Sequence, residues 1–117
     1  MRNDSIVYEK SFKFAKRIIK LYKFLVYEKK ERVISHQIMK SRTSIGANIS
    51  EATYAQSRKD FINKMSVALK EANETKYWIA LLEEEYISKK EADSLLSDVM
   101  EILKMLVSIV KNSKENE

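Results

Sequence analysis

Residues 41–52, which read S-R-T-S-I-G-A-N-I-S-E-A, constrain the fold of this 117-residue chain more than any other stretch. Read as a helix, the stretch places four polar side chains on one face because of their three- and four-residue spacing. These are Ser41, Ser44, Asn48 and Glu51. An adjacent apolar stripe consists of Ile38, Ile45, Ile49 and Ala52. The pattern predicts a helix that puts small and polar groups beside a core-facing stripe.

The only glycine of the chain, Gly46, lies in the middle of this expected helix. A glycine inside a helix costs about 1 kcal/mol relative to alanine. We therefore expect Gly46 to mark a position where another backbone approaches closely.

The polar face of the same stretch has two interpretations. One is a buried hydrogen-bond network that fixes helix register, in which Arg42 or a neighbouring lysine pairs with Glu51. The other is a ligand or nucleic-acid site built from Arg42, Asn48 and Glu51. Together with Ser44 and Gly46, these residues make up the candidate structural motif.

The composition favours an all-α fold. The chain has no proline, one glycine and 33% charged residues, so helix breakers are almost absent. It has no cysteine, which agrees with a reducing compartment. No apolar run approaches the roughly 20 residues that span a bilayer, and lysines interrupt the first thirty residues. We expect a cytoplasmic protein with no membrane partner.

Apolar periodicity and capping residues predict four helices, at about residues 5–28, 35–55, 58–86 and 89–111. The expected N-caps are Ser35, Ser57 and Ser88, the last two with an acidic residue three positions later. Apolar residues of the first helix expected to face inward are Phe12, Ala15, Ile18, Ile19, Tyr22, Leu25 and Val26. Short connections predict one domain, residues 1–117, folded as an antiparallel up-down-up-down four-helix bundle.

The net charge of +5 is unevenly distributed. Residues 1–35 carry ten Lys or Arg and four Asp or Glu, whereas residues 65–117 carry seven and eleven. One face of the first helix gathers five cations: Lys13, Lys16, Arg17, Lys20 and Lys23. Neighbouring like charges on a helix destabilise it by tenths of a kcal/mol each, which favours a compensating contact. That contact is nucleic-acid phosphate, or acidic residues of a neighbouring subunit, unless the charges serve solubility alone.

Residues suited to catalysis are scarce. The single histidine, His36, has no cysteine and no correctly spaced histidine or glutamate with which to bind a metal, and we interpret it as a surface residue. Neither a glycine-rich phosphate loop nor a nucleophile elbow is present. We therefore expect no catalytic residue, no metal and no cofactor. The bulky pair Tyr77 and Trp78 predicts a subunit interface.

The motif of residues 41–52, followed by Ser57, Asp60, Phe61 and the segment 68–74, resembles a bacterial family. The family is that of the four-helix-bundle proteins encoded in intervening sequences of 23S ribosomal RNA genes. The resemblance extends from about Phe12 to Leu106, and the element S-I-x-A-N-I-x-E is its most specific part. Family members commonly have glycine after this glutamate, where this chain has Ala52, which predicts a longer second helix.

The resemblance implies a small non-enzymatic bundle that assembles into a homo-oligomer, with a pentameric ring as the expected form. The same superfamily includes the accessory variability proteins of diversity-generating retroelements. Those proteins resemble basic pentameric bundles that bind nucleic acid and a partner reverse transcriptase. RNA or DNA, and a reverse transcriptase or another protein, are thus the expected partners. The alternative function is a structural adaptor whose charges serve subunit assembly or a protein partner.

Overall fold

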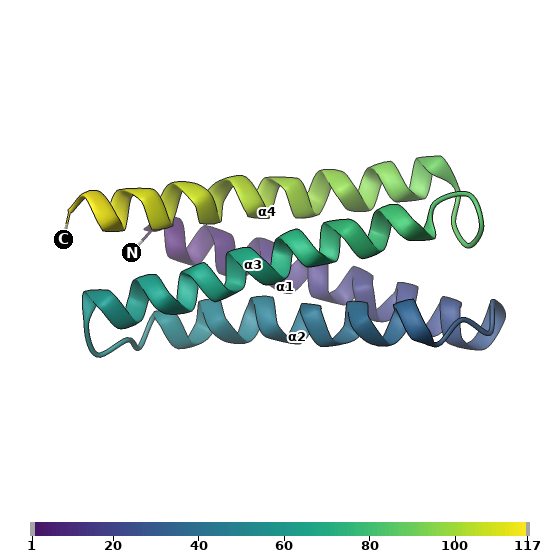
Figure 1. Ribbon diagram of the computed structural model, residues 1–117, viewed down its shortest axis with the longest axis horizontal. Coiled ribbons are helices and arrows are strands. Elements are labelled where there is room, and N and C mark those ends of the chain that lie inside the picture. The colour runs from purple at the N-terminus through teal and green to yellow at the C-terminus, as the bar shows by residue number, and fades with distance from the viewer. Residues whose placement is uncertain (1, 117) are drawn as a thin grey trace.

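A computed structural model describes residues 2–116, with the side chains of all of these except residues 2–4, 42 and 43. Four long helices follow one another along the chain: α1 (Arg2–Lys23), α2 (Val33–Ala52), α3 (Arg58–Leu82) and α4 (Lys89–Glu115). A short π-helix, η1 (Phe24–Glu28), continues α1. The helices run up, down, up and down, so that both chain ends lie at one end of the molecule (Figure 1). The predicted all-α four-helix bundle is confirmed.

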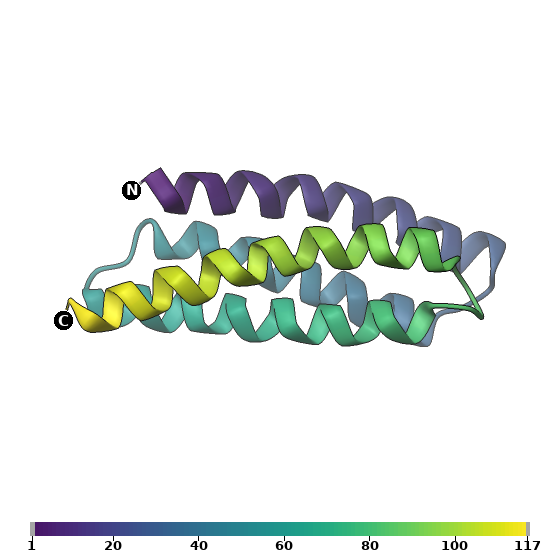
Figure 2. The ribbon, with the colours of Figure 1, turned by 90° about the horizontal axis from the view of Figure 1, so that it is seen from above.

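The four helices form a ring in which each packs against its sequence neighbours, and α4 closes the ring against α1 (Figures 1 and 2). The seam between α1 and α4 is the most sparsely packed of the four. The molecule measures 47 × 21 × 18 Å, and the 27-residue α4 accounts for about 40 Å of its length. One end holds the α2–α3 connection, and the opposite end holds the α1–α2 and α3–α4 connections (Figure 1).

The core consists of one buried stripe from each helix. On α3 the stripe recurs every three or four residues, at Met65, Ala68, Ala72, Thr75, Ile79 and Leu82. Thr75 is fully buried, and its hydroxyl donates to the carbonyl of Glu71 at 2.8 Å. The buried polar group therefore keeps a hydrogen bond, as burial without penalty requires.

The inward stripe of α1 differs from the expected one. Phe12, predicted to face the core, is 52% exposed, whereas Phe14 and Leu21 are buried. The buried positions on α1 are Val7, Ser11, Phe14, Ile18 and Leu21, in alternating steps of four and three residues that continue to Leu25 of η1. This 3.5-residue period is the one that antiparallel bundle packing favours, and it leaves Phe12 on the outside.

The helix ends are set by local chemistry. Ser57 and Ser88 cap α3 and α4, accepting from the backbone N–H of Asp60 at 3.0 Å and Glu91 at 3.1 Å. These two predicted caps are confirmed. The third, Ser35, was predicted wrongly, because α2 already begins at Val33.

Glu31 caps α2 instead. Its carboxylate accepts from the backbone N–H groups of Val33 at 3.0 Å, Ile34 at 2.9 Å and Ser35 at 2.8 Å. Glu31 is only 8% exposed, and Lys30 before it adopts a left-handed backbone with φ of 57°. The reversal at Lys30 thus brings a buried anion to the positive end of the helix dipole.

Three further boundaries differ from the expected ones. α2 ends at Ala52 rather than near residue 55, because a turn follows in which Tyr54 N–H donates to the Glu51 carbonyl at 3.1 Å. The absence of the family's glycine therefore does not lengthen the helix. α3 ends at Leu82 rather than near residue 86, and the left-handed Glu84, with φ of 77°, follows it. α4 continues to Glu115.

Gly46 does not mark a close helix approach. A Cβ atom built at this position would have no atom within 4 Å outside its own helix and chain neighbours. The expectation of a tight backbone contact was wrong, since the position opens onto a shallow surface hollow beside Tyr8 and Phe12.

Because the site is open, Gly46→Ala should stabilise the protein by about 1 kcal/mol through helix propensity alone. Gly46→Leu should also be tolerated, because its Cβ meets no atom within 4 Å and the position adjoins a surface hollow. Chemical denaturation followed by circular dichroism measures both. Destabilisation by the alanine variant would mean that the position is packed after all.

Candidate nucleic-acid interface

The cations predicted on one face of α1 separate into two groups. Lys13, Lys16, Lys20 and Lys23 are exposed on its outer side, and we call them the α1 lysines. Arg17 is only partly exposed and turns toward α4. The outer face is therefore a stripe of lysines alone, which extends about 15 Å from Lys13 to Lys23 at the helical rise.

Arg17 connects α1 to α4. Its Nη1 lies 2.7 Å from Asp98 Oδ2, and its Nη2 lies 3.6 Å from Glu91 Oε1. Lys10 forms a further ion pair with Glu101 across the same seam. The basic first part of the chain and the acidic last part thus meet within one chain.

The hydrogen bond that Lys10 donates to Glu101 raises the pKa of this lysine above its ordinary value of 10.5. A cation whose pKa is raised on folding stabilises the folded state fully below the ordinary pKa. The contribution of this pair is therefore present at neutral pH and is lost as the pH rises through the raised pKa, above 10.5.

A double-mutant cycle on Arg17 and Asp98 should give a coupling of about 0.5–1 kcal/mol, the upper part of the range for partly exposed ion pairs. The variants Arg17→Met, Asp98→Asn and their combination provide the cycle, with unfolding followed by urea titration. Salt should weaken the coupling. A coupling of zero at low salt would show that the contact does not hold the seam.

Acidic groups within the chain compensate little of the positive charge of the α1 lysines. The Nζ of Lys13 lies 3.3 Å from Oε1 of Glu9, in an exposed ion pair between residues four positions apart. Lys16 lies 5.0 Å from the ring centroid of Phe12. Within residues 5–116, apart from the undescribed side chains at 42 and 43, Lys16, Lys20 and Lys23 form no ion pair. Three solvated ammonium groups on one helix face can contact successive phosphates as point charges.

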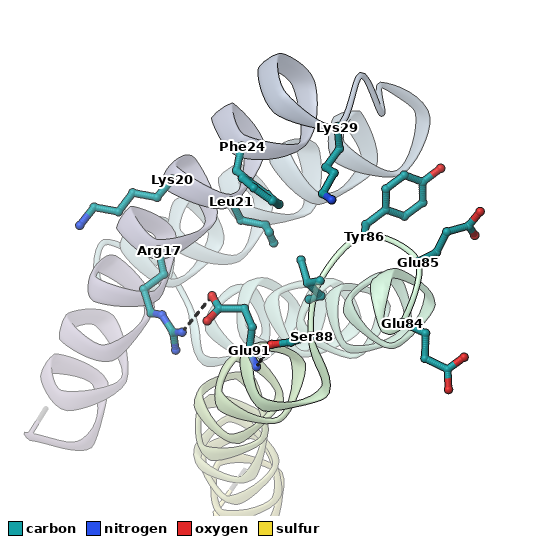
Figure 3. A pocket seen from close by; sticks show the side chains of 11 residues that line it. Arg17, Lys20, Leu21, Phe24, Lys29, Glu84, Glu85, Tyr86, Ser88 and Glu91 are labelled. Atoms are coloured by element: carbon teal, nitrogen blue, oxygen red, sulfur yellow. Dashed lines mark hydrogen bonds and ion pairs between the residues drawn. The ribbon is translucent and has the colours of Figure 1, made fainter.

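A hollow of about 660 Å³ adjoins this face at the end of the bundle that carries the α3–α4 connection (Figure 3). The α1 and η1 side contributes Arg17, Lys20, Leu21, Phe24 and Lys29. The α3–α4 connection and the start of α4 contribute Glu84, Glu85, Tyr86, Ile87, Ser88 and Glu91. No pattern in the sequence indicates this site, because its two walls are about sixty residues apart in the chain.

The described side chains of the structural motif on α2 do not form one compact site. Asn48 donates from Nδ2 to the carbonyl of Ser44 at 2.7 Å within its own helix. Glu51 is exposed and pairs with Lys64 of α3 at 3.1 Å. The expected pairing of Glu51 with a lysine is present, but the pair lies on the surface and not in a buried network. The side chain of Arg42 lies outside the described part of the structure.

Of the remaining predicted residues, Tyr77 and His36 are exposed and Trp78 is partly buried. Tyr77 is 58% exposed, and its ring meets Trp78 edge to face at a centroid distance of 5.1 Å. Trp78 itself packs partly against the core. His36 is exposed on the first turns of α2.

Within residues 2–116, no helix has the length and hydropathy of a membrane span.

The chain is a small all-α protein: an antiparallel four-helix bundle with a stripe of lysines on its first helix. Within that class, it belongs to the 23S rRNA-intervening sequence protein family, whose model matches residues 3–108. The resemblance inferred from residues 41–52 is thereby confirmed.

The fold is also that of a crystal structure of a protein with unknown function from the S23 ribosomal protein family of Bacteroides thetaiotaomicron. The two chains are 58% identical and superpose with a TM-score of 0.90, over 93% of this chain and 98% of the other. Comparison with curated proteins gave no match.

Proposed function

We propose that the protein is a non-enzymatic homo-oligomer that binds RNA or DNA through the phosphates, using the α1 lysines. The observation that carries the proposal is the division of cations on α1. Lys10 and Arg17 form ion pairs with acidic residues of α4, whereas Lys16, Lys20 and Lys23 form no ion pair with the described residues. The intramolecular acids therefore leave this stripe with an uncompensated positive charge.

The binding should depend on phosphate and read little sequence. Flexible lysines neutralise phosphates and release counterions, which contributes affinity irrespective of base. Assembly of several copies would multiply one stripe into several, so that a long nucleic acid gains avidity.

Fluorescence anisotropy with labelled RNA and labelled duplex DNA tests this function. We expect both to bind at about 50 mM salt, the range in which counterion release favours complex formation. Binding to neither at that salt concentration would refute the proposal.

An adaptor function is the alternative, and exposed apolar side chains favour it. Pairs one helical turn apart lie on α1, Tyr8 with Phe12, and on α3, Tyr77 with Leu81. Large exposed apolar side chains in this arrangement are typical of protein interfaces. In this alternative the lysines serve assembly or a protein partner, such as a reverse transcriptase, and charge reversal on α1 would break the oligomer while nucleic acid never binds.

Both functions involve self-association, for which a homopentamer is the expected form. A cyclic ring joins two different surfaces of each subunit, and separate apolar patches on α1 and α3 provide two. Light scattering should return five times the 13.7 kDa chain mass at micromolar concentration. A mass of one chain would contradict the assembly.

A further inference from the structure

The hollow beside the α1 lysines has an aromatic wall and an apolar floor. Phe24 of η1 is 40% exposed and lies on one side, and Tyr86 of the α3–α4 connection lies on the other. Leu21 and Ile87 are buried beneath them. A volume near 660 Å³ falls within the usual range of ligand pockets, about 300–1,000 Å³. The hollow can thus accept a flat ring of moderate size.

A cation lies over the aromatic face of this hollow. The Nζ of Lys29 is 5.7 Å from the ring centroid of Phe24, and its side chain points toward the space between Phe24 and Tyr86 (Figure 3). A nucleobase offers what these two groups bind: a π-face for the phenylalanine ring and carbonyl or ring-nitrogen acceptors for the ammonium.

The charges around the hollow orient such a ligand. Lys20 lines the hollow and is also one of the α1 lysines. A nucleic acid whose phosphates contact the α1 lysines therefore reaches the edge of the hollow. On the opposite wall, the side chains of Glu84 and Glu85 point away from the hollow (Figure 3). Glu91 faces Arg17, 3.6 Å from it. A phosphate is therefore attracted to the α1 side, with its base directed between the aromatic rings.

The backbone holds these walls in unusual conformations. η1 is a π-helix, in which Lys29 N–H donates to the carbonyl of Phe24 at 3.2 Å. The facing connection contains the left-handed Glu84, and the N–H groups of Tyr86 and Ile87 both donate to the Leu82 carbonyl at 3.1 Å. π-helical turns occur frequently at functional sites, and here the turn displays Phe24 and Lys29 together.

We infer that this hollow binds one unpaired nucleobase of the nucleic acid whose phosphates lie on the α1 lysines. The inference rests on the proposed function and adds a preference to it: the protein favours nucleic acid with a single-stranded end or bulge over a continuous duplex. Phe24 stacks on the base, Lys29 donates to its acceptors, and Lys20 contacts the adjacent phosphate.

Two RNA probes test the inference: a blunt duplex, and the same duplex carrying a short single-stranded overhang that contains the fluorescent base 2-aminopurine. The wild-type protein should bind the overhang probe at least about fivefold more tightly, since base–aromatic stacking is worth that much or more. The 2-aminopurine fluorescence should fall on binding, because stacking on an aromatic ring quenches it.

Phe24→Leu keeps an apolar side chain but removes the stacking ring, so it should abolish both the preference and the quenching while blunt-duplex affinity stays the same. Lys29→Gln should reduce the preference without altering the apolar wall. Tyr54→Leu is the matched control, because Tyr54 is an 85% exposed aromatic residue in the α2–α3 connection at the opposite end of the bundle. It should change neither readout.

Equal wild-type affinity for the two probes would overturn the inference and leave the proposed function standing. Such equality is also the result expected if the hollow receives a protein segment instead of a base. A preference that survives in Phe24→Leu would likewise overturn it. Failure of the wild-type protein to bind even the blunt duplex at low salt would refute the proposed function, and this inference with it.

Discussion

Replacing Lys16 and Lys20 with glutamate should lower the affinity for RNA and duplex DNA by about two orders of magnitude or more at low salt, because two phosphate contacts become two repulsions. The two side chains are exposed, and no ion pair of the described residues is lost. Among the described residues, the substitution removes the contact of Lys16 with the Phe12 ring, worth about 0.5–1 kcal/mol. Circular dichroism should therefore show an unchanged helical fold, and anisotropy measures the affinity.

The control is the pair Lys104→Glu and Lys111→Glu on α4, two exposed lysines whose reversal changes the net charge equally. If α1 is the binding face, this pair should weaken binding far less. An equal loss from both pairs would show that total charge alone governs binding. Size-exclusion chromatography of both variants tests the adaptor alternative, which expects the α1 pair to break the oligomer.

Glu31→Ala should destabilise the fold by about 2–3 kcal/mol, since three buried or partly buried N–H groups lose a charged acceptor together. The carboxylate also interacts favourably with the positive end of the α2 dipole, and the alanine variant loses this interaction. For a bundle of this size, such a loss corresponds to a melting temperature lower by roughly 10 °C. Thermal and urea denaturation measure it.

Glu28→Ala is the matched control for this prediction. Glu28 is an exposed carboxylate three residues earlier, in η1, and its removal should change stability by less than about 0.5 kcal/mol. Glu31→Gln, which keeps one acceptor oxygen, should fall between the two. If Glu31→Ala costs no more than Glu28→Ala, the cap does not anchor the start of α2.

Features that depend on neighbours along the chain could be predicted from the sequence. Ser57 and Ser88 each lie three residues before the N–H group that they cap, so local spacing suffices to identify them. Four helices with short connections then leave few arrangements other than the antiparallel bundle.

Features that depend on tertiary geometry were missed or misassigned. Arg17 matches its lysine neighbours in spacing, but Asp98, 81 residues away, draws it to the α4 side. Glu31 reaches the start of α2 only because Lys30 adopts a left-handed conformation that lysine rarely takes. Gly46 indicated close packing, yet the face of α2 that carries it is open. Helix rotation within the bundle decides such cases, and no local pattern specifies it.

Phosphate binding by the α1 lysines is best tested by the dependence of nucleic-acid affinity on salt, because the slope of that dependence counts phosphate contacts. If Lys16, Lys20 and Lys23 of one subunit each neutralise a phosphate of duplex DNA, log Kobs should fall against log salt with a slope of about −2.7 or steeper. Between 50 and 200 mM salt the affinity should then drop about 40-fold. An affinity unchanged over that range, or no binding at 50 mM salt, would show that these lysines do not bind phosphates.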